Sequence, residues 1–304
     1  MLRGCDVQEI HLALCDEGFD PELARLEIDV AVEHPYIAAA RSHTVELSKR
    51  DWLLSIRKCL RNLSLQSQID AREAISSEDF LNSYYASNTP VVLGDVTRSW
   101  PVGKTWTPEY LKQRCGECHV DVRTTATGVR DGRQSAQMTF IEFLDSVDSP
   151  SAEKCFLRST KHGDNPDIIN QLRDELGTIP SILSGDDGNG PELRFGRAGY
   201  CHELIHEYSN RMHTQLYGTT RFLLIPPEEI RFLSDSGNGV SSVQVGSELG
   251  GGRKLDDRVQ KFEVHVRPGE AIFVPVGWWY QASAEDAVIS VVNTDFHWPN
   301  TYVR

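Results

Sequence analysis

The chain has 304 residues, of which 39% are hydrophobic and 25% are charged, and its formal net charge at pH 7 is −13. This composition is typical of a globular protein with a sizeable core. The negative charge argues against nucleic acid or an anionic membrane as a partner. The longest apolar runs are too short to cross a bilayer, and the acidic N-terminus lacks a signal-peptide pattern. These features predict a cytoplasmic protein.

Residues 1–70 are predicted to form an N-terminal helical region. Residues 21–32 and 51–63 place apolar side chains at spacings of three and four, as amphipathic helices do. Pro21 suits the first turn of a helix, and Asp51 could cap the second helix. We expect this region to cover a sheet or to form a dimer contact.

Residues 71–304 are predicted to form a second domain of short strands with a few helices. Strands are expected at 91–93, 120–124, 154–159, 216–225 (interrupted by a tight turn), 261–266, 271–275 and 287–293, and helices at 76–85, 108–114, 138–147 and 166–176. Residues 234–257 form a long Gly- and Ser-rich loop of the kind that often serves as a lid or a partner surface. Many short strands separated by turns predict a barrel-like sandwich with a helical layer.

The seven cysteines are odd in number and scattered, which suits reduced thiols better than a disulfide framework. Cys115, Cys118 and His119 match the Cys-x-x-Cys-His pattern of c-type haem attachment. Covalent haem attachment normally requires export, and no export signal is visible. We interpret the two thiols as an incidental pair, with structural zinc and redox pairing as alternatives.

The stretch 199–227 holds the densest set of groups that could bind a metal or move a proton. Three of the ten histidines, His202, His206 and His213, fall within twelve residues, together with Glu203 and Glu207. By count alone, this stretch resembles a metal-binding segment.

Four motifs give the sequence a specific resemblance: residues 80–93, 215–227, 266–280 and 293–300. Together they resemble the bacterial cupin-like branch of the JmjC oxygenases over roughly residues 75–304, and PGEAIFVPVGWW at 268–279 is the most specific piece. The resemblance implies a mainly β fold with some α, a double-stranded β-helix (jelly-roll) of eight strands in two facing sheets. It also implies Fe(II) held by a His-x-Asp…His triad, with 2-oxoglutarate beside it.

The chain departs from this family at each site position. The His-x-Asp pair falls on Ile205 and Glu207, and the distal histidine falls on Tyr280. Ile205 has no donor atom. The lysine that binds the 2-oxoglutarate carboxylate is replaced by Thr220, which argues against 2-oxoglutarate binding in the family's usual mode. Arg211 could substitute as a carboxylate clamp.

Strand alternation suggests a replacement set. If residues 205 and 207 point into the barrel mouth, residues 206 and 208 point away, and the resemblance places Arg211 and His213 in the pocket. His202, Glu207 and His213 are then candidate ligands for Fe(II) or another divalent metal. The alternative is a hydrogen-bonded polar cluster in which Arg211 pairs with Glu207.

Three functions therefore remain open. The first is a non-haem metal oxygenase with a non-standard site, acting on a small molecule, an amino acid or a peptide side chain. The second is a pseudo-oxygenase that serves as a metal-free binding or regulatory module. The third is a metal-independent cupin enzyme with Glu207 or His213 as general base and Tyr280 as acid. The N-terminal helices and the resemblance are compatible with a homodimer.

Overall fold

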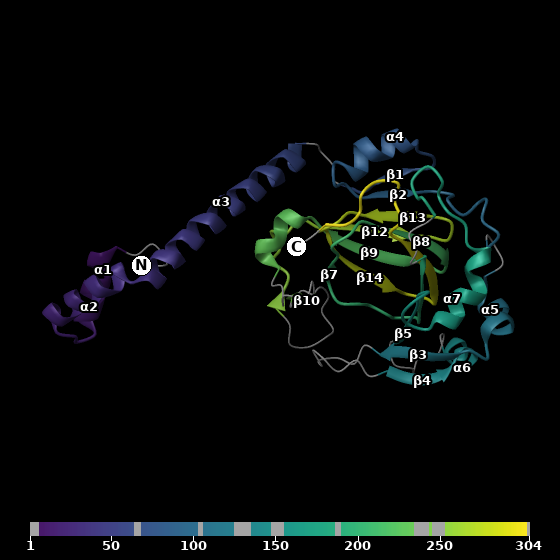
Figure 1. The fold of residues 1–304 in the computed structure, drawn as a ribbon, viewed down its shortest axis with the longest axis horizontal. Helices are drawn as coiled ribbons and strands as arrows, with labels where there is room; N and C mark the ends of the chain where they lie inside the picture. Colours follow the sequence, from purple (N-terminus) through teal and green to yellow (C-terminus); the bar gives the residue numbers. More distant parts are fainter. Residues whose placement is uncertain are drawn as a thin grey trace. The chain divides into compact units, whose positions relative to one another are not determined.

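The computed structural model describes residues 6–63, 68–102, 106–124, 135–146, 155–185, 190–233, 243–244 and 253–302. The chain divides into two compact units, Met1–Leu65 and Gln66–Arg304 (Figure 1). Among the described residues, no helix combines the length and the apolar character that a membrane span requires.

The first unit consists of three helices: α1 (Val7–Asp16), α2 (Pro21–Glu33) and α3 (Pro35–Leu63). Asp6 and Asp20 cap the first two helices, and Pro21 opens α2 as predicted. The expected helix at 51–63 is longer than predicted, and the expectation that Asp51 caps it was wrong. Residues 36–50 contain no glycine or proline, so the helix runs through Asp51 without interruption.

The second unit is a two-sheet β-structure with nine strands in one sheet and four in the other within the described ranges. The larger sheet has the order β1 (Asp70–Arg72), β2 (Val91–Leu93), β13 (Ala271–Val274), β8 (Arg211–Tyr217), β15 (Val288–Asn293), β6 (Glu192–Gly196), β5 (Cys155–Ser159), β3 (His119–Thr124) and β4 (Ser135–Thr139). The smaller sheet has the order β12 (Phe262–Val266), β9 (Thr220–Ile225), β14 (Trp279–Ala284) and β7 (Ile205–His206). The chain passes between the sheets from β6 through β15, and this confirms the double-stranded β-helix.

Short helices accompany the sheets: α4 (Ser77–Phe80), α5 (Pro108–Cys115), α6 (Phe140–Asp145) and α7 (Pro166–Leu172). The last three lie near the β3–β4 end of the larger sheet (Figure 1). Thr139 caps α6 in a reciprocal capping box with Glu142, as predicted, although Met138 belongs to β4 and not to the helix. Ser76 caps α4 by accepting a hydrogen bond from the Asp79 amide. The helix expected at 76–85 continues beyond α4 as a π-helical turn, Leu81–Tyr85.

The turn between β8 and β9 requires glycine. Gly218 has φ +64°, and a Cβ there would lie 2.0 Å from the carbonyl oxygen of Ala287. This turn sends the chain from the larger sheet to the smaller one, so it positions Thr220 and the rest of β9 opposite β8.

Outside the predicted loop at 234–257, five strands were missing from the strands expected from the sequence: β1, β4, β6, β7 and β14. The strand β6 carries Glu192 and Arg194 on a largely buried face, where a search for apolar runs does not find it. The predicted long loop at 234–257 lies largely outside the described residues. Its described part contains the short parallel pair β10 (Val243–Gln244) and β11 (Arg253–Lys254).

Candidate functional site

The register of the smaller sheet brings two predicted ligand positions together. Ile205 on β7 pairs with Tyr280 on β14, and His206 pairs with Trp279. Ile205 packs into the apolar cluster that contains Tyr280. The His206 ring lies 4.4 Å from the Trp279 ring, in a different cluster. The alternation expected for residues 205 and 206 is therefore present.

Glu207 forms an ion pair and is not a free ligand. Its Oε2 lies 3.1 Å from a terminal nitrogen of Arg211, and the other terminal nitrogen of Arg211 lies 3.9 Å from Glu192. This is the pairing that the polar-cluster alternative predicted.

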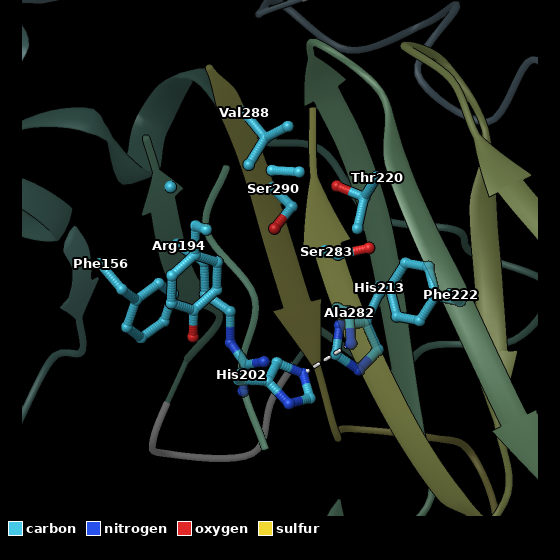
Figure 2. A pocket seen from close by; sticks show the side chains of 13 residues that line it. Phe156, Arg194, His202, His213, Thr220, Phe222, Ala282, Ser283, Val288 and Ser290 are labelled. Atoms are coloured by element: carbon cyan, nitrogen blue, oxygen red, sulfur yellow. Dashed lines mark hydrogen bonds between the residues drawn. The ribbon is translucent and has the colours of Figure 1, made fainter. Parts of the chain in front are cut away.

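Both ring nitrogens of His202 are bound to the backbone. The Ala282 amide donates to Nε2 at 3.0 Å (dashed line in Figure 2), so Nε2 carries no proton. Nδ1 therefore holds the proton and donates it to the Glu203 carbonyl at 2.5 Å. Burial lowers the pKa of His202 to about 4. The imidazole is neutral at pH 7 and has no lone pair to offer a metal.

His213 differs from His202 because one of its ring nitrogens has no partner. The residue is 4% exposed, and Nε2 makes no hydrogen bond to any described residue. Its ring lies 5.5 Å from the Tyr280 ring and 5.3 Å from the Phe222 ring, centroid to centroid. Burial lowers the pKa of His213 well below its ordinary value, and the charges of Arg194 and Arg211 lower it further.

Tyr280 and Arg211 add two more unsatisfied polar atoms beside His213. The Tyr280 side chain is fully buried, and neither its hydroxyl nor Nε of Arg211 has a hydrogen-bond partner of normal geometry among the described residues. Burial raises the pKa of Tyr280, and the nearby Arg194 guanidinium opposes that shift. Each such buried atom costs about 1–3 kcal/mol. Of these three residues, only His213 lines the cavity described below.

Sequence reasoning missed Glu192 and Arg194 on β6. Nε of Arg194 donates to Glu192 at 2.5 Å. Burial alone would raise the pKa of Glu192, but the charges of Arg194, Arg158 and Arg211 hold it below its ordinary value. The signal was present in the sequence: in residues 192–195, charged and apolar residues alternate, as they do in a strand with one polar face.

These groups belong to one ion-pair network across the larger sheet. Its members are Arg123, Arg158, Arg194, Arg211, Asp164, Glu192 and Glu207. Asp164 bridges Arg123 and Arg158, and Glu192 is shared among three arginines. With four arginines against three carboxylates, the network carries one positive charge in excess.

A cavity of about 30 Å³ lies between the two sheets beside this network. Its lining consists of Phe156, Arg194, Gly196, Tyr200, His202, His213, Thr220, Phe222, Ala282, Ser283, Ala284, Val288 and Ser290. Arg194, His202 and His213 come together along one side of it (Figure 2). Thr220 also lines the cavity, but its hydroxyl donates to Gln215 at 3.0 Å.

The residues present do not fit a three-ligand metal centre. Of the predicted set, only His213 has a nitrogen without a partner, because His202 is bound by the backbone and Glu207 by Arg211. Across the described ranges, no three His, Cys, Asp or Glu side chains are grouped as metal ligands would be. The assignment of His202, Glu207 and His213 as ligands stays a prediction.

The Cys115–Cys118 pair belongs to the packing around α5. Cys115 is buried in the core, and burial raises its pKa to about 12. Cys118 is partly buried, which raises its pKa, and its Sγ accepts a hydrogen bond from Gln171 at 3.0 Å. Metal and redox chemistry need the thiolate, and both surroundings favour the thiol.

Comparison with known proteins gives one family match and several distant relatives. The profile of the Cupin-like domain family matches residues 77–302. The chain is 25% identical over 261 residues to "Lysine-specific demethylase JMJ30" of Arabidopsis thaliana, an alignment that covers 82% of this chain and 58% of the relative. It is 24% identical over 263 residues to "2-oxoglutarate and iron-dependent oxygenase JMJD4" of Mus musculus, covering 76% and 60%.

A third relative carries a different name. The chain is 23% identical over 238 residues to "tRNA wybutosine-synthesizing protein 5" of Mus musculus, covering 71% of this chain and 74% of the relative. The chain spans only about three fifths of the length of the first two relatives.

Proposed function

We propose that this chain, which belongs to the Cupin-like domain family, binds a ligand without a metal. In this proposal the barrel keeps its cavity and binds a small molecule there without an iron centre. The cavity, the one-charge excess of the network and the unsatisfied Nε2 of His213 in the cavity wall support a binding role. We further propose that the protein works in the cytoplasm.

The observation that carries the proposal is what stands at the three ligand positions. Ile205 supplies no donor atom, Glu207 is neutralised by Arg211, and Tyr280 is buried with a pKa raised by burial. A phenol with a raised pKa is a poor metal ligand at neutral pH, because the metal needs the phenolate. None of the three positions therefore offers an available ligand.

A second candidate is a divalent-metal oxygenase with a non-standard site. It is favoured by the mouse relative whose name describes an iron- and 2-oxoglutarate-dependent oxygenase, and by the unpartnered Nε2 of His213. Such a metal would supply redox chemistry when bound. The acid–base alternative, with Glu207 or His213 as base and Tyr280 as acid, stays a prediction, and it requires Glu207 to leave Arg211 before it can accept a proton.

Metal analysis of the full chain separates these candidates. Protein purified without chelators and without a metal-affinity step is measured by mass spectrometry for Fe, Mn, Co, Ni, Cu and Zn, before and after anaerobic addition of Fe(II). We expect far less than one metal per chain. We also expect no oxygen consumption with 2-oxoglutarate.

Stoichiometric metal that is lost in His213→Ala would overturn the proposal and favour the oxygenase. The matched control is His265→Ala, because His265 is an exposed histidine on β12 away from the cavity. Metal retained equally by both variants would place the metal outside this site.

A further inference from the structure

The cavity wall holds one positively charged group, the Arg194 guanidinium. Arg194 extends along this wall, and its Nε donates to Glu192. Because His213 is neutral, its Nε2 can donate or accept. A ligand that satisfies these groups must therefore be rich in acceptors.

Charge and size narrow the ligand further. The network around Glu192 has one positive charge in excess, so a ligand with one negative charge would balance it. A cavity of about 30 Å³ has room for about two water-sized groups. A carboxylate head group fits this space.

Part of the cavity lining is apolar, which suits an organic acid better than an inorganic ion. Phe156 stacks on Tyr200 with ring centroids 4.9 Å apart, and Phe222 and Val288 add apolar surface to the lining. A short alkyl or ring substituent would contact these side chains while the carboxylate faces Arg194. Arginine binds carboxylates through a planar, two-donor fork.

We infer that the cavity binds a small monocarboxylate, with Arg194 as the clamp and His213 as an orienting hydrogen-bond partner. This inference rests on the proposed function. It differs from the binding of 2-oxoglutarate that the family resemblance implies, because the ligand has a single charge and its clamp comes from β6.

Calorimetric titration of the full chain tests the inference with acetate, propanoate, pyruvate and 2-oxoglutarate as probes, and with acetamide as the neutral isostere of acetate. We expect the monocarboxylates to bind and acetamide and 2-oxoglutarate not to bind. Arg194→Leu should weaken binding about 10- to 100-fold, the effect of removing a charged hydrogen bond. Arg221→Leu is the matched control, because Arg221 forms an exposed ion pair with Glu263 away from the clamp.

Arg194→Leu leaves Glu192 with one partner fewer, so a second variant is needed in case the first does not fold. Arg194→Lys keeps the charge but loses the fork, and it should bind propanoate with intermediate affinity. A ligand-induced shift of the His213 Nε2 resonance in ¹⁵N NMR would report contact directly. Equal binding of acetamide and acetate, or unchanged affinity in both Arg194 variants, would overturn the inference.

The proposed function and the proposed ligand class are contradicted by different results. If carboxylate binding appears only after stoichiometric Fe(II) is loaded, the proposed metal independence is wrong. If no metal binds and none of these acids binds, only the ligand class is wrong. Competition by chloride or sulfate as strong as by propanoate would show a general anion site and would also overturn the ligand class.

The first unit carries a second, independent observation. One face of α3 carries a row of exposed apolar side chains, which we name the α3 stripe. Successive members are seven, four, four and three residues apart in the sequence, so they lie on the same side of the helix. Its members are Val45, Trp52, Ile56, Leu60 and Leu63, with exposed fractions from 37% to 75%. In the described part of this unit only Ala24 and Ile28 are buried hydrophobic side chains. So small a core does not stabilise a 29-residue helix.

Charge complementarity identifies what covers this stripe. Residues 6–33, which contain α1 and α2, hold nine acidic residues and one basic residue. Residues 45–63 of α3 hold five basic and two acidic residues. Two copies related by a two-fold axis can place each acidic hairpin beside the partner's basic segment, which is the self-complementary arrangement of a symmetric dimer. We propose that the first unit dimerises with a second copy of this chain through the α3 stripe.

A charge-swap experiment on the full chain tests the dimer by light scattering after size exclusion. Variant one is Lys49→Glu with Arg50→Glu, and variant two is Glu22→Lys with Glu27→Lys. We expect the unaltered chain to be a dimer that weakens at high salt, each variant to be monomeric, and their equimolar mixture to form a dimer. A monomeric unaltered chain at all concentrations would overturn the proposal. Dimers that both variants retain would overturn the charge pairing.

Discussion

Ile205 and Tyr280 lie directly opposite each other in the antiparallel pair of β7 and β14. The family resemblance places two metal ligands at these positions, and the register shows that the backbone still brings the positions together. The backbone pairing that the resemblance requires is therefore present, while isoleucine and tyrosine stand where the resemblance predicts the ligands.

Histidines placed at positions 205 and 280 should create a metal-binding site. In Ile205→His with Tyr280→His, the new side chains face each other beside Glu207, which exchanges Arg211 for the metal. We expect about one Co(II) per chain, seen as visible d–d absorption. Each single variant should bind at least tenfold more weakly, because it lacks one of three ligands. A folded double variant that binds no Co(II) would show that the backbone does not hold positions 205 and 280 as a metal site requires.

Removing Glu192 should destabilise the second unit strongly. Glu192→Gln leaves the positive charges of Arg194, Arg158 and Arg211 without their shared carboxylate, and breaking a buried ion pair costs about 3–5 kcal/mol. The measurement is urea unfolding at pH 7. Glu263→Gln is the matched control, because its partner Arg221 is exposed and the loss should be about 0–1 kcal/mol. Equal losses of unfolding free energy in the two variants would contradict a stabilising role for the buried ion-pair network.

Stability should fall as the pH decreases from about 6.5 to 4. His202 has a pKa of about 4 in the folded chain, lowered by burial from 6.5, and the pKa of His213 is lowered as well. In this window the unfolded chain binds more protons than the folded chain, so acid favours unfolding. Each histidine contributes a slope of up to about 1.4 kcal/mol per pH unit.

Unfolding midpoints in urea across this pH range, compared with those of His202→Gln, measure the contribution of His202. Glutamine can still accept the bond from the Ala282 amide but does not titrate. The variant should therefore show a shallower decline than the unaltered chain. An identical pH profile would mean that His202 is charged in the folded chain near pH 6.

The turn at Gly218 should not tolerate a side chain. Gly218→Ala places a methyl group 2.0 Å from the Ala287 carbonyl oxygen, so both the positive φ and the clash oppose folding. Gly269→Ala is the matched control, since Gly269 has φ +93° and its nearest neighbour would be 3.7 Å away. Thermal unfolding should show a loss of about 1–3 kcal/mol for Gly269→Ala and a clearly larger loss for Gly218→Ala. A smaller loss at Gly218 would contradict the turn geometry.

Much of the fold could be predicted from the sequence because it depends on local patterns. Apolar runs located β9, β13 and β15, alternation located β12, and Thr139 and Pro21 marked helix starts correctly. The patterns failed where tertiary contacts override them. The strand β6 has charged residues inside the barrel, and α3 begins sixteen residues before Asp51 because nothing in between interrupts it.

For the site, the sequence by itself determined which chemistry is missing. Isoleucine at 205 has no donor in any fold, and the threonine at 220 cannot supply a lysine's charge. Only the tertiary structure decided what the remaining groups do. The protonation of His202 depends on the Ala282 amide, which is eighty residues away in the chain, and the charge around Arg194 depends on β5, β6 and β8 lying in one sheet. Side-chain identity is local, whereas hydrogen-bond partners and burial are set by segments that meet only when the chain has folded.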